Sequence, residues 1–178
     1  MNWLRNIIIL LIFNLFILIS YAQVHIACIG DSVTKGYGIK MVPSYDVGDS
    51  LDVHPTEKYV IGQRLANLVL KHQHQYSLQA DSPYPLVADY NSKSITLSLS
   101  NATQLKTLGT NKIKELDAIL STGETVGITN AIIKGNKIII PNTLRKVRRI
   151  IYAYRPYSGG NLINEAGVPV STFSVNLL

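Results

Sequence analysis

The residue best suited to chemistry near the amino end is Ser32, in the turn Gly30-Asp31-Ser32-Val33-Thr34. This turn follows an apolar run, Val24 to Ile29, which predicts a strand buried on both faces. Ligands of open α/β sheets bind at the carboxyl ends of such strands. A nucleophilic serine needs an exposed Oγ, a sharp turn before it and a backbone N–H for the oxyanion, and Gly30 with Ser32 can supply these. The alternative is that the Asp-Ser pair caps a helix.

The second candidate is His54, in the string Leu51-Asp52-Val53-His54-Pro55 just before a predicted helix. A helix N-terminus lowers the proton affinity of a histidine, which favours the neutral imidazole that a general base requires. We therefore expect His54 to activate Ser32, with Asp52 orienting the other ring nitrogen. Taken alone, a His-Pro pair in this place favours a capping role, and only the combination with the serine turn favours catalysis.

The elements that must position these residues are a helix and the first strand. The helix is predicted from about Thr56 to His74, because Pro55 suits its first turn and apolar residues recur on one face at helical spacing. These residues are Ile61, Leu65, Leu68 and Val69. The string Ser82-Pro83-Tyr84-Pro85 then ends the helical pattern and marks the predicted domain boundary.

Beyond this boundary the sequence predicts strands and turns. The segment from Ile95 to Leu99 alternates as a half-buried strand, and the segments Thr125–Ile133 and Lys137–Ile140 flank a Gly135-Asn136 turn. A β-branched and aromatic run extends from Val147 to Tyr154, and the glycines and prolines between Asn161 and Phe173 are typical of loops. These features predict a small β-sandwich over residues 85–178.

Two blocks of this sequence resemble the first and last conserved blocks of the SGNH (GDSL-type) hydrolases. They are Ile26-Ala27-Cys28-Ile29-Gly30-Asp31-Ser32-Val33-Thr34 and Asp52-Val53-His54-Pro55, and the string Gly62-Gln63-Arg64-Leu65-Ala66 is similar to the sialate O-acetylesterase branch. The tail strings Tyr152-Ala153-Tyr154-Arg155-Pro156, Asn161-Leu162-Ile163-Asn164 and Ala166-Gly167-Val168-Pro169 resemble the β-rich C-terminal region of those esterases. The resemblance implies an acetyl ester of a carbohydrate as substrate, Ser32 as nucleophile, His54 as base, and no metal or organic cofactor.

The sequence departs from this family between the two blocks. Only 22 positions separate Ser32 from His54, and the family's middle blocks, whose glycine and asparagine complete the oxyanion hole, have no counterpart. The joint near Ile39-Lys40-Met41 therefore looks like a large internal deletion or an error in the assembled gene. Leu51 stands where many relatives carry an aspartate, which leaves Asp52 and Asp49 as alternatives for the acidic residue. Because one lost oxyanion donor costs about 100- to 1000-fold in rate, we expect weak or absent activity.

The first 22 residues predict a secretory signal peptide, with Arg5, an apolar run from Ile7 to Ile19, and a Ser20-Tyr21-Ala22 cleavage site. We accordingly expect a secreted or periplasmic protein with no stable membrane span after cleavage. The net charge is +6, but the basic residues are scattered, which argues against nucleic acid as a partner. The single cysteine, Cys28, excludes an internal disulfide framework.

Other residues that could bind ligands have ordinary structural explanations. His72 and His74 lie two positions apart near a helix end, and solvated side chains are favoured there over a metal site. Tyr152, Tyr154 and Tyr157 could stack on a sugar ring, although packing is the favoured interpretation.

The sequence as a whole thus predicts three regions. Residues 1–22 are the signal peptide, residues 23–80 form a truncated, flavodoxin-like α/β remnant of an SGNH hydrolase, and residues 85–178 form a β-sandwich. The predicted function is a carbohydrate (sialate-type) O-acetylesterase. The alternative is a non-catalytic secreted β-module that binds a glycan or a partner domain.

Overall fold

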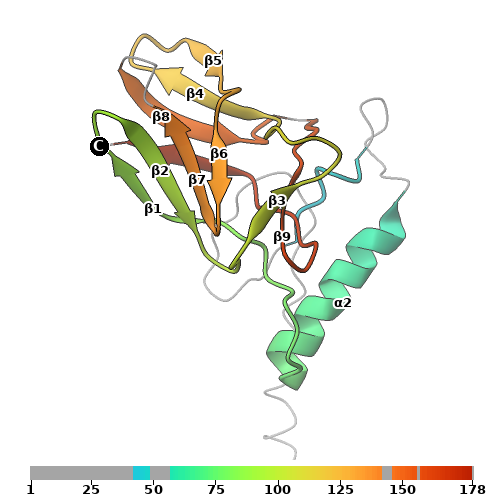
Figure 1. The fold of residues 1–178 in the computed structure, drawn as a ribbon. Coiled ribbons are helices and arrows are strands. Elements are labelled where there is room, and N and C mark those ends of the chain that lie inside the picture. The colour runs from blue at the N-terminus through green and yellow to red at the C-terminus, as the bar shows by residue number, and fades with distance from the viewer. Residues whose placement is uncertain (1–41, 49–56, 142–145, 156, 178) are drawn as a thin grey trace, which may run out of the picture. The chain divides into compact units, whose positions relative to one another are not determined.

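The structure, a computed structural model, describes residues 42–48, 57–141, 146–155 and 157–177 (Figure 1). All of these residues belong to one compact unit of the chain. Within them the chain forms one helix and ten strands. In chain order these are α2 (Lys58–His74), β1 (Pro85–Tyr90), β2 (Ser94–Leu99), β3 (Leu105–Thr107), β4 (Leu116–Leu120), β5 (Thr125–Gly127), β6 (Ile132–Lys134), β7 (Lys137–Pro141), β8 (Val147–Tyr152), β9 (Leu162–Asn164) and β10 (Phe173–Asn176).

The strands form two four-stranded sheets and one two-stranded sheet. The first sheet has the order β1-β2-β7-β6, the second has the order β10-β8-β4-β5, and β3 pairs with β9. Every strand pair within the described residues is antiparallel. Figure 1 shows the two larger sheets as separate layers, with β2 and β7 central in one and β8 and β4 central in the other.

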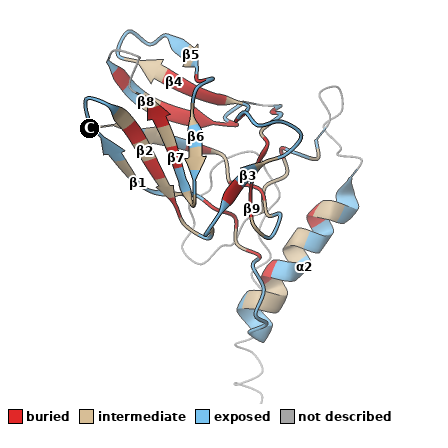
Figure 2. Cartoon of the chain, viewed as in Figure 1, coloured by how far each residue is buried: buried red, intermediate tan, exposed pale blue. Residues whose placement is uncertain are grey.

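The two larger sheets share one hydrophobic core (Figure 2). From the first sheet, Ile95, Leu97 and Ile138 are at most 1% exposed, and from the second sheet Ala118 and Ile150 are fully buried. All belong to one contiguous cluster, so the sheets pack face to face as in a β-sandwich. The predicted β-rich C-terminal region is therefore confirmed as antiparallel β-structure. The α/β part of the predicted fold is not confirmed, because its first strand and serine turn lie outside the described residues.

Several predicted elements agree with the structure. Residues Ser94–Leu99 form β2 with alternating burial, as the sequence pattern indicates. Lys134 pairs with Lys137 across the Gly135-Asn136 turn, and Gly135 has a φ of +61°, which a residue with a side chain rarely adopts. The helix ends at His74 as predicted, and Gln75 in the left-handed conformation terminates it.

Other predictions about the strands were wrong. The segment Thr125–Ile133 is not one strand, because β5 pairs with β4 in the second sheet and β6 pairs with β7 in the first. The chain therefore crosses between the layers at residues 128–131. The segment Asn161–Phe173, predicted as loop, contains the buried strand β9, which pairs with β3.

The helix α2 is only partly covered. Ile61 and Leu68 are buried and lie seven positions apart, two helical turns along one face, while Leu65 and Val69 are partly exposed. Lys71, His72 and His74 in its last turn complement the negative end of the helix dipole. In the part of the chain that the structure describes, no helix combines the length and apolar character needed to cross a bilayer.

Candidate functional site

The predicted catalytic residues lie outside the described part of the chain. Ser32 and Gly30 fall within residues 1–41, and Asp52, His54 and the alternative acid Asp49 fall within residues 49–56. Their roles remain predictions. The described residues that flank 49–56 in sequence are the segment 42–48 and the start of α2 at Lys58.

An arginine of α2 holds the segment 42–48. Arg64 donates from one guanidinium nitrogen to the backbone carbonyl of Pro43 at 2.7 Å and to Asp46 Oδ1 at 2.7 Å. Its other terminal nitrogen donates to Asp46 Oδ2 at 2.5 Å. This two-point pairing of a guanidinium with a carboxylate fixes orientation as well as distance. The chain on both sides of residues 49–56 is therefore joined through one side chain.

The same segment is attached to the β-core through Tyr45. This ring is 8% exposed and lies edge-on to Tyr152, with ring centroids 6.2 Å apart. Tyr45 donates its hydroxyl proton to the carbonyl of Val170 at 2.8 Å, and Tyr152 Oη accepts the N–H of Leu162 at 2.8 Å. Because the Tyr45 proton is directed to Val170, the 3.3 Å contact between the hydroxyls has Tyr152 as donor. Burial raises the pKa of both hydroxyls, that of Tyr152 to about 12, so both phenols stay neutral at physiological pH.

A pocket of about 240 Å³, lined mainly by residues with polar side chains, lies where the chain after α2 meets two loops of the β-region. Its polar lining residues are Lys71, Gln79, Asp81, Asn101, Thr103 and Glu165, and Ala102 is the apolar residue among those that line it. They come from the helix end, the chain that follows it, the β2–β3 loop and the turn after β9.

Glu165 joins these segments. Its carboxylate accepts the backbone N–H of Thr103 at 3.1 Å, the N–H of Gln104 at 3.2 Å and the side-chain amide of Gln79 at 2.9 Å. A hydrogen bond from its own backbone N–H, followed by those from Gln104 and Gln79, lowers the pKa of Glu165 to about 2 against the opposing effect of burial. The carboxylate is therefore ionised under all physiological conditions.

Asp81 also lines the pocket, and it pairs with the end of the helix. Lys71 Nζ is 2.6 Å from its Oδ2, and His72 Nε2 is 2.9 Å from its Oδ1. Burial acts to raise the pKa of Asp81, but the hydrogen bonds from Lys71 and His72 outweigh it and hold the pKa below its usual value. His72 thus has a carboxylate partner. No group of three or more metal-ligating side chains occurs among the described residues.

Two buried asparagines hold the loops around β9. Asn164, fully buried, donates to the carbonyl of Asn101 at 3.0 Å and accepts the N–H groups of Ala166 and Val168. Asn161 donates to the carbonyls of Leu108 and Lys112 and accepts the N–H of Lys114. The string Asn161-Leu162-Ile163-Asn164 therefore has a structural role, and Asn164 in particular fixes Asn101 at the pocket.

The three tyrosines proposed from sequence as sugar-stacking residues separate into two groups. Tyr152 is fully buried in the core and cannot contact a ligand, whereas Tyr154 and Tyr157 are 52% and 51% exposed. Between them in sequence, Arg155 pairs with Asp117 at 2.9 Å and with Glu115 at 3.2 Å. The Glu115 contact is an ion pair without an aligned hydrogen bond, since Glu115 Oε2 has no hydrogen-bond partner.

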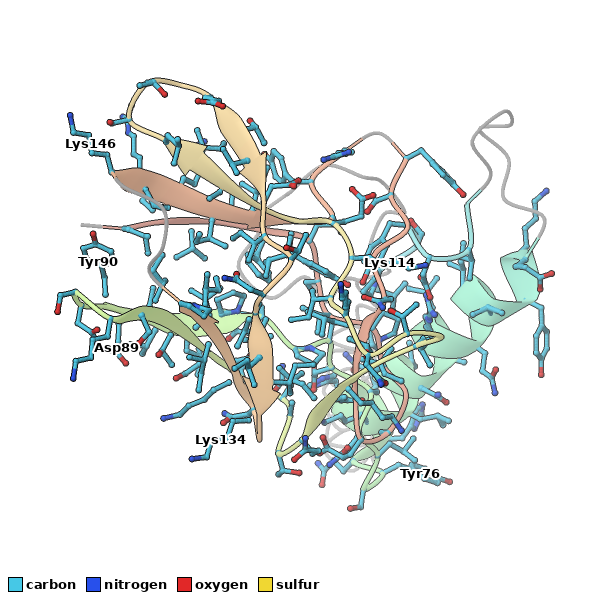
Figure 3. All side chains as sticks on the ribbon, turned by 45° about the horizontal axis from the view of Figure 1, so that its top comes forward. Tyr76, Asp89, Tyr90, Lys114, Lys134 and Lys146 are labelled. Carbon is cyan, nitrogen blue, oxygen red and sulfur yellow. The ribbon has the colours of Figure 1, made fainter. Side chains whose placement is uncertain are left out.

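Three of the lysines lie apart from one another. Figure 3 shows Lys114, Lys134 and Lys146 in separate parts of the fold, with Lys134 at the end of β6.

A comparison with solved structures identifies a similar fold. The chain superimposes on a carbohydrate acetylesterase from Xanthomonas citri with a TM-score of 0.68 and 23% sequence identity, over 75% of this chain. The described fold resembles part of a carbohydrate acetylesterase. At this level of identity the likeness concerns the fold alone. The chain spans 31% of the length of that enzyme. No protein-family model matches the chain, and no curated protein sequence is significantly similar to it.

Sequence reasoning missed the pocket entirely. Its residues come from positions 71–81, 101–103 and 165, and none belongs to a recognisable motif. The one local signal is the turn after β9, where Asn164 and Gly167 fix the backbone beside Glu165. That signal predicts a turn but not the contact between Glu165 and Thr103, 62 positions away.

Proposed function

We propose that this chain derives from a secreted carbohydrate O-acetylesterase and removes acetyl groups from sugars through Ser32, His54 and Asp52. The observation that carries this proposal is the likeness of the described fold to part of a carbohydrate acetylesterase. The serine turn and the histidine block agree with it, since both resemble blocks of SGNH hydrolases.

The proposed reaction has two steps. His54 accepts the proton of Ser32 as Oγ attacks the acetyl carbonyl, and the C–O bond to the sugar breaks as the proton passes to the departing sugar oxygen. Water then attacks the acetyl-serine, with His54 again accepting a proton, and acetate leaves while Ser32 regains its hydrogen. The reaction consumes one water and needs no cofactor.

The segment 42–48, which precedes the predicted histidine block in sequence, is held on two sides. Tyr45 attaches this segment to the core, and Arg64 joins it to α2, which follows that block in sequence.

We expect the activity to be low. The glycine and asparagine that complete the oxyanion hole in SGNH hydrolases have no counterpart here, and each missing donor costs about 100- to 1000-fold in rate. The backbone N–H at Ser32 remains as a donor in this proposal.

The second candidate is a secreted module that binds a glycan without hydrolysing it. The chain spans only 31% of its structural neighbour, and the described part is mostly antiparallel β-structure. Tyr154 and Tyr157 offer exposed rings of the kind that stack on sugars.

Hydrolysis of p-nitrophenyl acetate and release of acetate from acetylated xylan and an O-acetylated sialic acid distinguish the two candidates. The enzyme proposal predicts that Ser32→Ala and His54→Gln each reduce the rate to that of the buffer. Ser121→Ala, at an exposed serine after β4, serves as the matched control and should leave the rate unchanged. Equal rates for the unaltered chain and Ser32→Ala would remove the enzyme proposal for this chain and leave the binding module.

A further inference from the structure

We propose that the pocket formed by Lys71, Gln79, Asp81, Asn101, Thr103 and Glu165 binds one neutral sugar ring and discriminates against sialic acids. The proposal rests on the proposed function for the class of ligand, a carbohydrate. It otherwise rests on the size, charge and hydrogen-bonding groups of the pocket itself.

The size of the pocket fits a single sugar ring. Its volume of about 240 Å³ is below the roughly 300–1,000 Å³ of pockets that enclose drug-sized ligands. Six of its seven lining residues carry polar side chains, yet carbon atoms contribute more of its exposed surface than nitrogen and oxygen atoms do. A sugar ring, which presents C–H groups on its faces and hydroxyls at its edge, matches both kinds of surface.

The pocket retains hydrogen-bonding capacity of both kinds. The Thr103 hydroxyl and the Gln79 side-chain carbonyl make no hydrogen bond to any described residue. Lys71 directs its ammonium to Asp81 and has three donors in all. Sugar hydroxyls both donate and accept, so they can satisfy the carboxamide carbonyl, the hydroxyl and the remaining ammonium donors together.

The charges of the pocket favour a neutral ligand. Asp81 is paired with Lys71 and His72, whereas among the described residues no cation lies within ion-pair distance of Glu165. The hydrogen bonds to the Glu165 carboxylate keep it ionised, so it presents negative charge to the pocket. A sialic acid has its own carboxylate, and placing it beside that of Glu165 is unfavourable.

The lining is fixed before any ligand arrives. Glu165 holds the β2–β3 loop through the N–H groups of Thr103 and Gln104, and Asn164 holds the carbonyl of Asn101. Gln79 is tied to Glu165 as well. A pocket arranged in this way loses little conformational entropy on binding, so a few hydrogen bonds suffice for measurable affinity.

The test is an amide ¹H–¹⁵N NMR titration of the full chain carrying Ser32→Ala, with N-acetylglucosamine as the neutral probe and N-acetylneuraminic acid as the anionic probe. N-acetylglucosamine should shift the amides of residues 79, 101–103 and 165 in a saturable manner. N-acetylneuraminic acid should bind at least ~10-fold more weakly, as about 1.4 kcal/mol of repulsion gives. Tighter binding of the anionic sugar, or no saturable shift at these amides with the neutral one, would overturn the proposal.

Matched variants identify the groups that bind. Thr103→Val and Lys71→Met should each weaken N-acetylglucosamine binding about 10-fold, because each removes one hydrogen-bonding group. Thr129→Val and Lys58→Met, at exposed positions outside the pocket, should leave the affinity unchanged. Thermal unfolding checks that each variant remains folded, and unchanged affinity in a folded Thr103→Val and a folded Lys71→Met would contradict the proposal.

The two proposals fail separately. Neither probe carries an O-acetyl ester and the binding assay lacks Ser32, so sugar binding is measured without hydrolysis. Binding without Ser32-dependent hydrolysis would reject only the esterase, and hydrolysis without binding at these amides would reject only the pocket.

Discussion

Arg64 and Asp46, 18 positions apart, are joined by two hydrogen bonds of 2.7 and 2.5 Å that tie the helix α2 to the segment 42–48. The two side chains are 17% and 21% exposed, so solvent screens the pair only in part. Arg64 donates a third hydrogen bond to the Pro43 carbonyl, so it contacts both the backbone and a side chain of this segment.

Arg64→Met should therefore destabilise the fold. Charge-assisted hydrogen bonds contribute about 1.5–3 kcal/mol when buried, and partial exposure reduces this to about 1–2 kcal/mol here. Urea unfolding followed by circular dichroism measures the change. Arg148→Met, at an exposed position on β8, is the control and should stay within about 0.5 kcal/mol. Equal stability of the two variants would mean that the Arg64 contacts contribute nothing.

Gly160→Ala should destabilise the core while Gly159→Ala does not. A Cβ at Gly160 would lie 2.8 Å from the Tyr152 hydroxyl and 2.8 Å from the Tyr45 ring, closer than atoms pack. A Cβ at Gly159 would meet nothing within 4 Å. Overpacking of this kind costs about 1–3 kcal/mol. Thermal unfolding of the two variants gives a direct comparison. An unchanged melting temperature for Gly160→Ala would show that Tyr45 and Tyr152 do not lie this close to Gly160.

Tyr152→Phe tests the hydroxyl at the centre of the core. It removes the acceptor of the Leu162 N–H, which is then buried without a partner, at a cost of about 1–3 kcal/mol. Tyr154→Phe, on a ring that is 52% exposed, should change the free energy of unfolding by less than about 0.5 kcal/mol. If both variants unfold at the same denaturant concentration, the hydroxyl of Tyr152 does not stabilise the fold.

Stability in acid should depend on Glu165. Its pKa is lowered from 4.5 to about 2 in the folded chain, so it contributes stability above pH 4.5 that is lost as the pH falls toward 2. Glu165→Gln should be less stable than the unaltered chain at pH 7, and the difference should shrink between pH 4.5 and pH 2. Unfolding curves at several pH values measure this, with Glu124→Gln in the exposed β4–β5 turn as control. If the stability difference does not change with pH, the ionised carboxylate of Glu165 does not contribute to the free energy of unfolding.

The elements that the sequence predicted best are those whose burial alternates simply. Ile95, Leu97 and Leu99 face the core from β2, and their spacing of two predicts that strand directly. The strand β4 was missed because Asp117 interrupts the apolar pattern, and its burial depends on Arg155, 38 positions away. Only the folded chain brings that partner near.

Two features could not be predicted from local sequence patterns. One is the crossing of the chain from one sheet to the other, and the second is the pocket. Residues on either side of Ile128 read as one β-branched run, but the chain changes sheets there while the Ile128 N–H bonds to the carbonyl of Leu116. The pocket likewise depends on Glu165 reaching Thr103 and Gln79. Such pairings are set by tertiary packing, for which a single sequence carries no periodic signal.

The most direct test of the esterase proposal is covalent trapping at Ser32. A fluorophosphonate should add to Ser32 Oγ with loss of fluoride, and mass spectrometry of the digested chain should find the adduct on the peptide that contains Ser32. Labelling should disappear in Ser32→Ala and slow by at least about 100-fold in His54→Gln, which lacks the general base. Labelling that is absent, or that is equally fast in His54→Gln, would contradict the proposed acyl transfer.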